Sequence, residues 1–154
     1  MTLDDYLRVG ETIVLGEHRF EPAEIKRFAA KYDPQPFHLD DEAARRSVLG
    51  GLCASGWHTA AMWMKLNIAA GAAPAPWAGD GPAPEFGPSP GFRDLRWLRP
   101  VMAGDTITYA RRVTGHRALA SRPGFRLAEV VATAHNQRGE PVLTFTSTVL
   151  LRAN

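Results

Sequence analysis

The sequence predicts an α+β domain in which an antiparallel β-sheet wraps around one apolar helix. One long apolar stretch with helical character lies near the middle of the chain, and four segments rich in β-branched and aromatic residues follow it, separated by turn residues. Consecutive strands with short connections favour an antiparallel sheet. A helix that is apolar on all sides and a sheet that is apolar on one face bury each other, so the sheet is expected to enclose the helix.

The composition limits the class of protein. A chain of 154 residues with 45% hydrophobic and 22% charged residues predicts a single globular domain over residues 1–154. The net charge is only +2 and the arginines are scattered, so we expect no nucleic-acid partner. No secretory signal is visible, the most apolar stretch contains Lys65 and Asn67, and the single cysteine forms no intrachain disulfide; together these predict a cytoplasmic protein without a membrane partner.

The first third of the chain predicts one strand and two helices. Residues 12–20 are rich in β-branched and aromatic residues, which is typical of a strand. Pro22 suits a first helical position, and apolar residues then recur at helical spacing as far as Tyr32. Residues 40–46 begin with acidic side chains that favour a helix N-terminus, so they predict a second, short helix.

The stretch between these helices, YDPQPFHLD from Tyr32 to Asp40, predicts a rigid connector. Asp33 and Gln35 each precede a proline, which pushes both residues into extended geometry. We therefore expect an irregular segment that contains no helix.

The middle of the chain predicts a buried helix from Ser55 to about Ala70, because its apolar residues surround the helix axis. Residues 71–91 hold six of the twelve prolines and five glycines, so we expect a long loop without helix or strand, bordering the ligand pocket. Four strands are predicted after this loop, at residues 92–98, 106–115, 124–136 and 142–152.

Several kinds of site have no support in the sequence. Cys53 has no CxxC context and is expected to be a small buried residue, and Ser55 does not lie in a GxSxG motif. The five histidines show no paired-ligand spacing, so no metal site is predicted. The sequence also contains no GxGxxG or Walker loop.

Three residues remain as candidates for catalysis. Asp33 and His38 combine a carboxylate with an imidazole, but Asp33 is equally typical of a turn and His38 of a histidine bonded to a carbonyl. Gly56 is expected at the start of the central helix, where free N–H groups hold an anion. Alternatively, Ser55 is simply the helix N-cap and Gly56 a small residue that allows close packing.

The blocks YDPQPFHLD, GGLCASGWHT, SPGFRDLRWLRPVMAGDTI and HNQRGEPVLTF together resemble the MaoC-like dehydratases, which include the (R)-specific enoyl-CoA hydratases. The resemblance covers nearly the whole chain. It implies a hot dog fold, a homodimer with each active site at the subunit interface, and an acyl-CoA thioester as substrate. Coenzyme A would then be part of the substrate, and no separate cofactor is expected.

The resemblance also implies roles for individual residues. The hydratase motif reads Asp, any residue, Asn, Pro, an apolar residue and His; Asp33 and His38 match it, whereas Gln35 replaces the asparagine. The Gly56 N–H is implied to form the oxyanion hole, and Ser55 stands where many members have a histidine. Gln35, Ser55 and Trp57 are expected near the substrate.

Two other functions stay open from the sequence. A hot dog thioesterase would bind the same acyl-CoA but cleave it. A non-catalytic acyl-CoA-binding module is a second alternative, because Gln35 and Ser55 depart from the hydratase pattern. Several arginines near the predicted strands are candidate partners for the coenzyme A phosphates: Arg93, Arg96, Arg99, Arg111 and Arg112.

Overall fold

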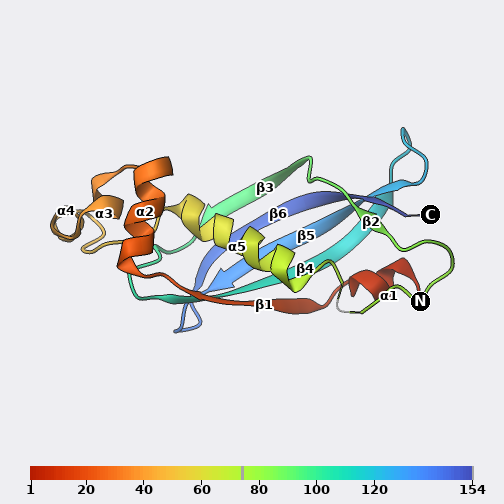
Figure 1. Ribbon diagram of the computed structural model, residues 1–154, viewed down its shortest axis with the longest axis horizontal. Helices are drawn as coiled ribbons and strands as arrows, with labels where there is room; N and C mark the ends of the chain where they lie inside the picture. Colours follow the sequence, from red (N-terminus) through yellow and green to blue (C-terminus); the bar gives the residue numbers. More distant parts are fainter. Residues whose placement is uncertain (74, 154) are drawn as a thin grey trace.

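One curled antiparallel sheet and one long helix dominate the computed structural model, which describes residues 1–73 and 75–153 (Figure 1). The strand order is β1-β4-β5-β6-β2, and β3 also pairs with β6. The strands are β1 (Thr12–Arg19), β2 (Glu85–Phe86), β3 (Gly91–Trp97), β4 (Thr106–Ala118), β5 (Phe125–His135) and β6 (Pro141–Arg152). Five of these six strands lie within one residue of their predicted starts, and the predicted hot dog arrangement is confirmed.

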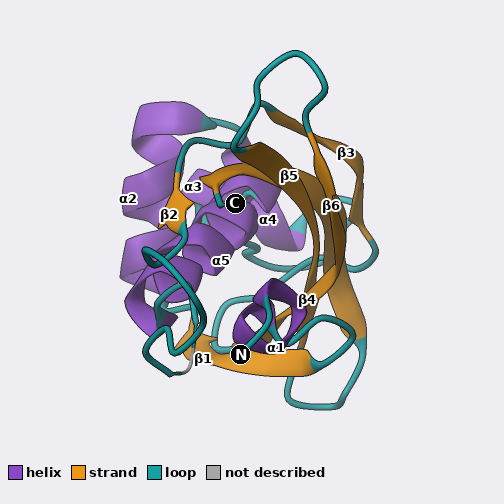
Figure 2. Cartoon of the chain, turned by 90° about the vertical axis from the view of Figure 1, so that its right-hand side faces the viewer, coloured by secondary structure: helices purple, strands orange, loops and turns teal. Residues whose placement is uncertain are grey.

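Helix α5 (Gly56–Ala70) lies in the curve of the sheet, as Figures 1 and 2 show. Its Trp63 is buried among strand residues, and the Trp63 Nε1–H donates to the carbonyl of Ala110 at 2.9 Å. The hydroxyl of Tyr109 donates to the carbonyl of Thr59 at 2.8 Å. These two hydrogen bonds satisfy buried polar groups and fix α5 against β4.

One prediction for α5 is wrong in part, because a single chain buries only one side of it. Trp57, Met64 and Ile68 are 52%, 47% and 71% exposed. Their spacing places them on one face of the helix, together with the exposed Ala61. An apolar composition therefore indicated burial correctly on the sheet side, while the opposite face of α5 remains uncovered within the chain.

Three helices pack at the N-terminal end of α5: α2 (Pro22–Tyr32), α3 (Pro36–Leu39) and α4 (Asp41–Arg45) (Figure 1). The prediction that the connector contains no helix is wrong, because α3 lies inside it. Gln35 is extended as expected, with φ −89° and ψ 144°. However, Pro36 occupies the first turn of α3, where its missing N–H removes no helical hydrogen bond.

Two short elements, α1 and β2, were not predicted from the sequence. Helix α1 (Leu3–Leu7) begins at a capping box in which Thr2 and Asp5 bond each other's backbone N–H. Strand β2 interrupts the predicted loop, and its Phe86 packs against the core while Glu85 pairs with Arg152. Neither segment is long enough to show a periodic pattern. No helix in the described part of the chain has the length and apolar character needed to cross a bilayer.

Candidate active site

The connector between α2 and α4 brings Asp33 and His38 together. Asp33 follows the last residue of α2, and His38 lies in α3 with only 6% of its surface exposed. The chain turns back between them, because Gln35 is extended and α3 begins immediately afterwards. As a result, His38 Nε2 lies 3.3 Å from Asp33 Oδ2. Extended geometry throughout would hold residues five apart at about 16 Å.

A hydrogen bond to the backbone orients the His38 ring. The distance between His38 Nδ1 and the carbonyl oxygen of Cys53 is 2.6 Å. Because a carbonyl only accepts hydrogen bonds, Nδ1 carries the proton. In the neutral ring Nε2 is then an acceptor that faces Asp33, itself an acceptor when ionised. A water molecule with two protons has the complementary donors for this pair.

The carboxylate of Asp33 is kept ionised by its neighbours. Burial alone raises the pKa of Asp33, but hydrogen bonding from Gln35 and Ser55 and the nearby His38 together lower it below its usual value. The side-chain amide of Gln35 donates to Asp33 Oδ1 at 2.6 Å, which leaves Oδ2 for His38. Gln35 thus contacts the dyad directly, although it is one methylene longer than the asparagine of the hydratase motif.

The start of α5 lies beside the dyad. Ser55 is fully buried and is the N-cap, since its hydroxyl accepts from the Trp57 N–H at 3.3 Å. Gly56 is the first helical residue, so its N–H has no acceptor within the helix. Trp57 is half exposed and packs edge-on against Trp97, with ring centroids 5.0 Å apart.

Trp97, at the end of β3, was not identified as a site residue from the sequence. Its Nε1–H donates to the Gly56 carbonyl at 2.9 Å, and its ring covers Gly56 closely. A Cβ atom on Gly56 would lie 2.4 Å from the ring. Close packing therefore requires a glycine here, as the structural alternative predicted, and this is compatible with a role for its N–H. The position of Trp97 depends on strand pairing, which no short motif specifies.

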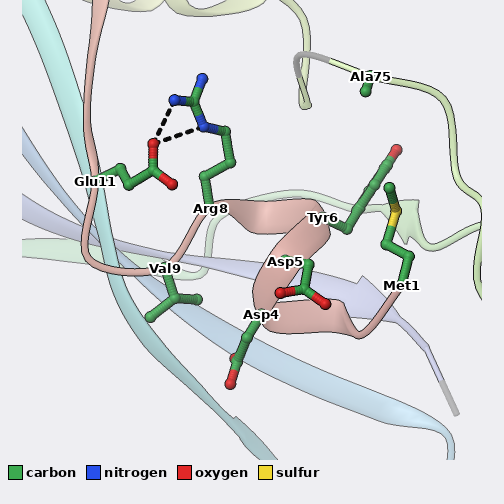
Figure 3. A pocket seen from close by; sticks show the side chains of 8 residues that line it. All are labelled: Met1, Asp4, Asp5, Tyr6, Arg8, Val9, Glu11 and Ala75. Atoms are coloured by element: carbon green, nitrogen blue, oxygen red, sulfur yellow. Dashed lines mark hydrogen bonds and ion pairs between the residues drawn. The ribbon is translucent and has the colours of Figure 1, made fainter.

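Asp33, Gln35, His38, Gly56 and Trp57 all line one cavity of about 390 Å³. Trp97 and Arg99 add to its wall, whereas the capping residue Ser55 lies behind it. A slightly larger hollow of about 420 Å³ lies beside α1, between Asp4, Arg8 and Glu11 (Figure 3). That hollow contains neither member of the dyad, so the smaller cavity is the candidate active site.

Cys53 is a poor nucleophile, although it lies next to His38. The thiol is buried, and its Sγ lies 3.5 Å from His38 Nδ1. Burial and the negative charge of Asp33 raise the pKa of Cys53 to about 11. The thiolate needed for nucleophilic attack is therefore disfavoured, in agreement with the expectation that Cys53 is a small buried residue.

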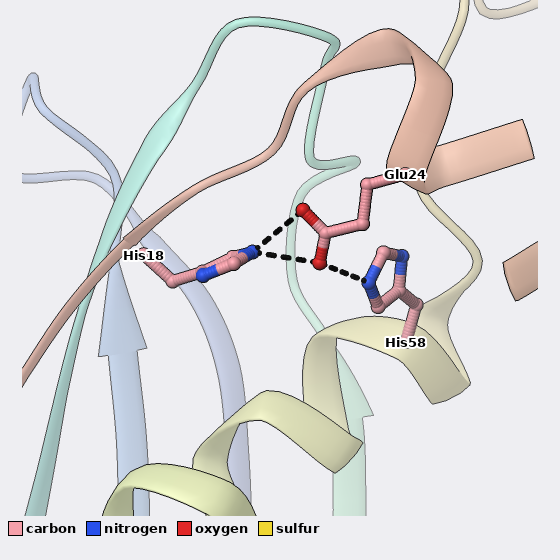
Figure 4. A group of neighbouring side chains, drawn as sticks. All are labelled: His18, Glu24 and His58. Atoms are coloured by element: carbon pink, nitrogen blue, oxygen red, sulfur yellow. Dashed lines mark hydrogen bonds and ion pairs between the residues drawn. The ribbon is translucent and has the colours of Figure 1, made fainter. Parts of the chain in front are cut away.

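A second cluster, His18, Glu24 and His58, joins β1, α2 and the first turn of α5 (Figure 4). Nε2 of His18 and Nε2 of His58 lie 2.9 and 3.1 Å from Glu24 Oε1, and His58 stacks on Phe28. Its sequence spacing gave no signal, because the three residues come from β1, α2 and α5.

The cluster does not fit a resident metal ion. A metal on Nε2 would place the proton of His58 on Nδ1, and this buried atom has no hydrogen-bond partner among the described residues. Ligating histidines almost always donate this second N–H to an acceptor. We interpret the cluster as a hydrogen-bonded link between α2, β1 and α5. His58 therefore belongs to this cluster and does not line the candidate active site.

The candidate coenzyme A arginines lie in different environments. Arg99 borders the candidate active site and pairs with Glu140 at 3.2 Å. Arg93 pairs with Glu129, and Arg112 is exposed on β4. Arg111 is instead buried near the C-terminal end of α5.

The curled sheet, the helix packed in its curve and the Asp33–His38 pair beside the helix start define a hot dog protein with a carboxylate–imidazole dyad. The model of the MaoC-like domain family matches residues 7–135, and the chain belongs to this family.

A MaoC-like dehydratase from Rhodospirillum rubrum has a similar structure, with a TM-score of 0.80 and 39% identity over 100% of this chain and 98% of that one. A monoamine oxidase regulatory protein from an Archaeoglobus species gives a TM-score of 0.77 at 25% identity, covering 97% and 95% of the two chains. The (R)-hydratase PhaJ1 from Pseudomonas aeruginosa shares the fold, with a TM-score of 0.67 and 21% identity over 95% of this chain and 83% of that one.

Among curated proteins, the uncharacterized protein YdeM of Bacillus subtilis is 35% identical over 71 residues. That match covers 46% of this chain and 50% of YdeM, so it spans about half the length of the curated relative.

Proposed function

We propose that the chain is an (R)-specific 2-enoyl-CoA hydratase, which adds water reversibly across the C2=C3 double bond of an acyl thioester. The observation that carries the proposal is the geometry of the dyad: Asp33 Oδ2 and His38 Nε2 are acceptors 3.3 Å apart in one cavity, next to the first N–H of α5. Membership of the MaoC-like domain family supports the same reaction class.

The proposed mechanism assigns one task to each group. A water bound to both Asp33 and His38 loses a proton to the dyad as its oxygen attacks C3 of the enoyl thioester. Negative charge moves onto the thioester oxygen, which accepts a hydrogen bond from the Gly56 N–H. The dyad then returns the proton to C2, so all atoms of the water end in the 3-hydroxyacyl product. In the reverse direction a protonated His38 donates to the leaving hydroxyl.

Hydrogen bonds already hold both side chains of the dyad in position before substrate binds. Gln35 and the Cys53 carbonyl fix Asp33 and His38 from two sides, which reduces the reorganisation needed in the transition state. Trp57 and Trp97 form an aromatic wall of the cavity, and Arg99 is the candidate cation for the coenzyme A phosphates.

We further propose that two copies of the chain assemble into a homodimer. The exposed face of α5 with Trp57, Met64 and Ile68 is apolar, and Phe92 and Trp97 on β3 are 59% and 43% exposed. Large apolar residues gathered in this way mark interaction surfaces. Because Trp57 and Trp97 also line the candidate active site, a second copy seated here would close the cavity.

Crotonyl-CoA is the test substrate, because hydration removes the absorbance of its conjugated thioester. We expect Asp33→Asn to lower kcat at least 100-fold, the scale of a positioned acid or base, with a much smaller change in KM. His38→Ala should be similarly damaging, and the double variant little worse than the worse single one. The matched controls are Asp41→Asn and His135→Ala, which change exposed residues outside the cavity.

The same experiment separates the alternatives. Loss of conjugation with an intact thioester indicates hydration, whereas release of free thiol indicates a thioesterase. If neither occurs across several acyl lengths, the chain is a binding module. Near wild-type hydration by a folded Asp33→Asn protein would show that the dyad is not catalytic.

A further inference from the structure

A second cavity of about 320 Å³ lies between the C-terminal half of α5 and the sheet. Apolar side chains form most of its wall, including Trp63, Val113, Val130 and Val149. Gly71 and residues 86–89, from the two ends of the predicted loop, line one side of this cavity. Its size is at the lower end of the range for small-molecule sites, which are concave and mostly apolar with a few polar groups.

One buried cation faces this apolar cavity. Arg111 is only 7% exposed, and it is the single ionisable residue among the described residues that line the cavity. Its guanidinium donates to Asn67 Oδ1 at 2.7 Å and to the carbonyls of Gly71 and Ala72 at 2.7 and 3.2 Å. All three acceptors are neutral.

No carboxylate pairs with Arg111 in the part of the chain that the structure describes. The carbonyls at the end of α5 offset part of the cost of burying the charge. However, a guanidinium has five N–H donors, and the three hydrogen bonds leave donors available. Burial also lowers the pKa of Arg111.

We propose that this cavity binds a carboxylate joined to an apolar chain, with the carboxylate on Arg111 and the chain against the valines and Trp63. A carboxylate matches the fork of donors in a guanidinium and supplies the missing countercharge. The apolar wall selects an aliphatic chain over a small polar anion, because a small anion would lose its hydration here without gaining equivalent hydrogen bonds from the wall.

Two molecules carry this chemistry: a free carboxylic acid, or an acyl thioester whose far end is a carboxylate. The second assignment rests on the proposed function and places the reacting end near Gly56, at the other end of the same helix. Thr59 borders the candidate active site, and Trp63, one turn later on α5, borders the Arg111 cavity. Binding to the Arg111 cavity itself does not depend on catalysis.

Calorimetry with octanoate and octanamide tests the binding, because the two probes differ mainly in charge. We expect the wild-type protein to bind octanoate at least tenfold more tightly than octanamide. Arg111→Met should abolish this difference, and Arg111→Lys should retain part of it. Arg112→Met is the matched control, because Arg112 is the next residue of β4 but is exposed and does not line the cavity.

The wild-type comparison needs no variant, so it stands even if Arg111→Met fails to fold. Equal affinity for both probes, or no binding of either, would overturn the proposal, as would an Arg111→Met protein that keeps the preference. The inactive Asp33→Asn protein should bind octanoate normally, which separates this result from the fate of the hydratase proposal.

A kinetic comparison then identifies the source of the carboxylate. If the ligand is the tail of the substrate, enoyl-CoA thioesters that end in a carboxylate should have at least tenfold higher kcat/KM than methyl-terminated ones. Arg111→Met should remove this advantage while Arg112→Met keeps it. Octanoate binding without this preference would assign the cavity to a free carboxylic acid.

Discussion

Replacing Gly56 by alanine tests how tightly Trp97 and the helix start are coupled. The added methyl group would lie 2.4 Å from Cε2 of Trp97 and 2.7 Å from Cδ2 and Nε1, distances that real Cβ contacts essentially never show. The start of α5 is fixed by the Ser55 cap and by the packing of Trp63, so the indole is the group that must move. We therefore expect Gly56→Ala to displace Trp97.

The cost follows from the contacts that the indole loses. Its hydrogen bond to the Gly56 carbonyl contributes about 1 kcal/mol, and the edge-on contact with Trp57 about 0.5–1.5 kcal/mol. The higher helix propensity of alanine returns up to about 1 kcal/mol. The net destabilisation is then about 1 kcal/mol, which corresponds to a fall in Tm of about 2–4 °C for a domain of this size.

The assay is a double-mutant cycle with Gly56→Ala, Trp97→Ala and the double variant. Urea midpoints give the stabilities, and crotonyl-CoA hydration gives kcat/KM. Since Trp97→Ala already removes the clashing ring, adding Gly56→Ala should cost nothing further, and the coupling energy should be about 1–2 kcal/mol. Single-variant costs that add to within about 0.5 kcal/mol would refute the close packing of Trp97 on Gly56.

Three other perturbations have defined outcomes. Gln35→Ala removes the amide that lowers the pKa of Asp33, so the acidic limb of the pH profile of kcat/KM should move to higher pH, and Gln35→Asn should move it less. Burial lowers the pKa of His58, so the folded protein binds fewer protons than the unfolded chain, and its stability should decrease as pH falls below about 6.5. In His58→Gln, the stability measured from urea midpoints should depend less on pH. Met64→Glu should halve the mass measured by light scattering, while Lys65→Glu, on the next helix position, should leave a dimer.

Long elements were predictable because each repeats one simple pattern many times. From Leu143 to Leu151 apolar residues largely alternate with threonines in the sequence, and in β6 Leu143, Phe145 and Leu151 are buried whereas Thr144 is only partly buried. Strand order was not predictable in the same way. β3 is followed by β4 in the chain but pairs with β6, which lies two strands away from β4 in the sheet.

The candidate site was predictable where neighbours in sequence are also neighbours in space. The segment around Asp33 and His38 contains both members of the dyad, and proline geometry explains why it is stiff, although not that α3 forms within it. Trp97 and Arg99 come from the end of β3 and the segment after it. Their place in the cavity depends on the pairing of β3 with β6, a long-range contact with no local signal.

The uncovered face of α5 links the fold to the proposed assembly. A helix that is apolar on every side must be covered on every side, and the sheet covers only one. Trp57, Met64 and Ile68 are therefore exposed in the single chain, although the apolar sequence pattern predicts that they are buried. Trp57 also lines the candidate active site, and Met64 and Ile68 line the Arg111 cavity. A second copy on this face would bury the exposed residues and narrow both cavities at once, so assembly, the dyad and the carboxylate site should respond together to a charge placed at Met64.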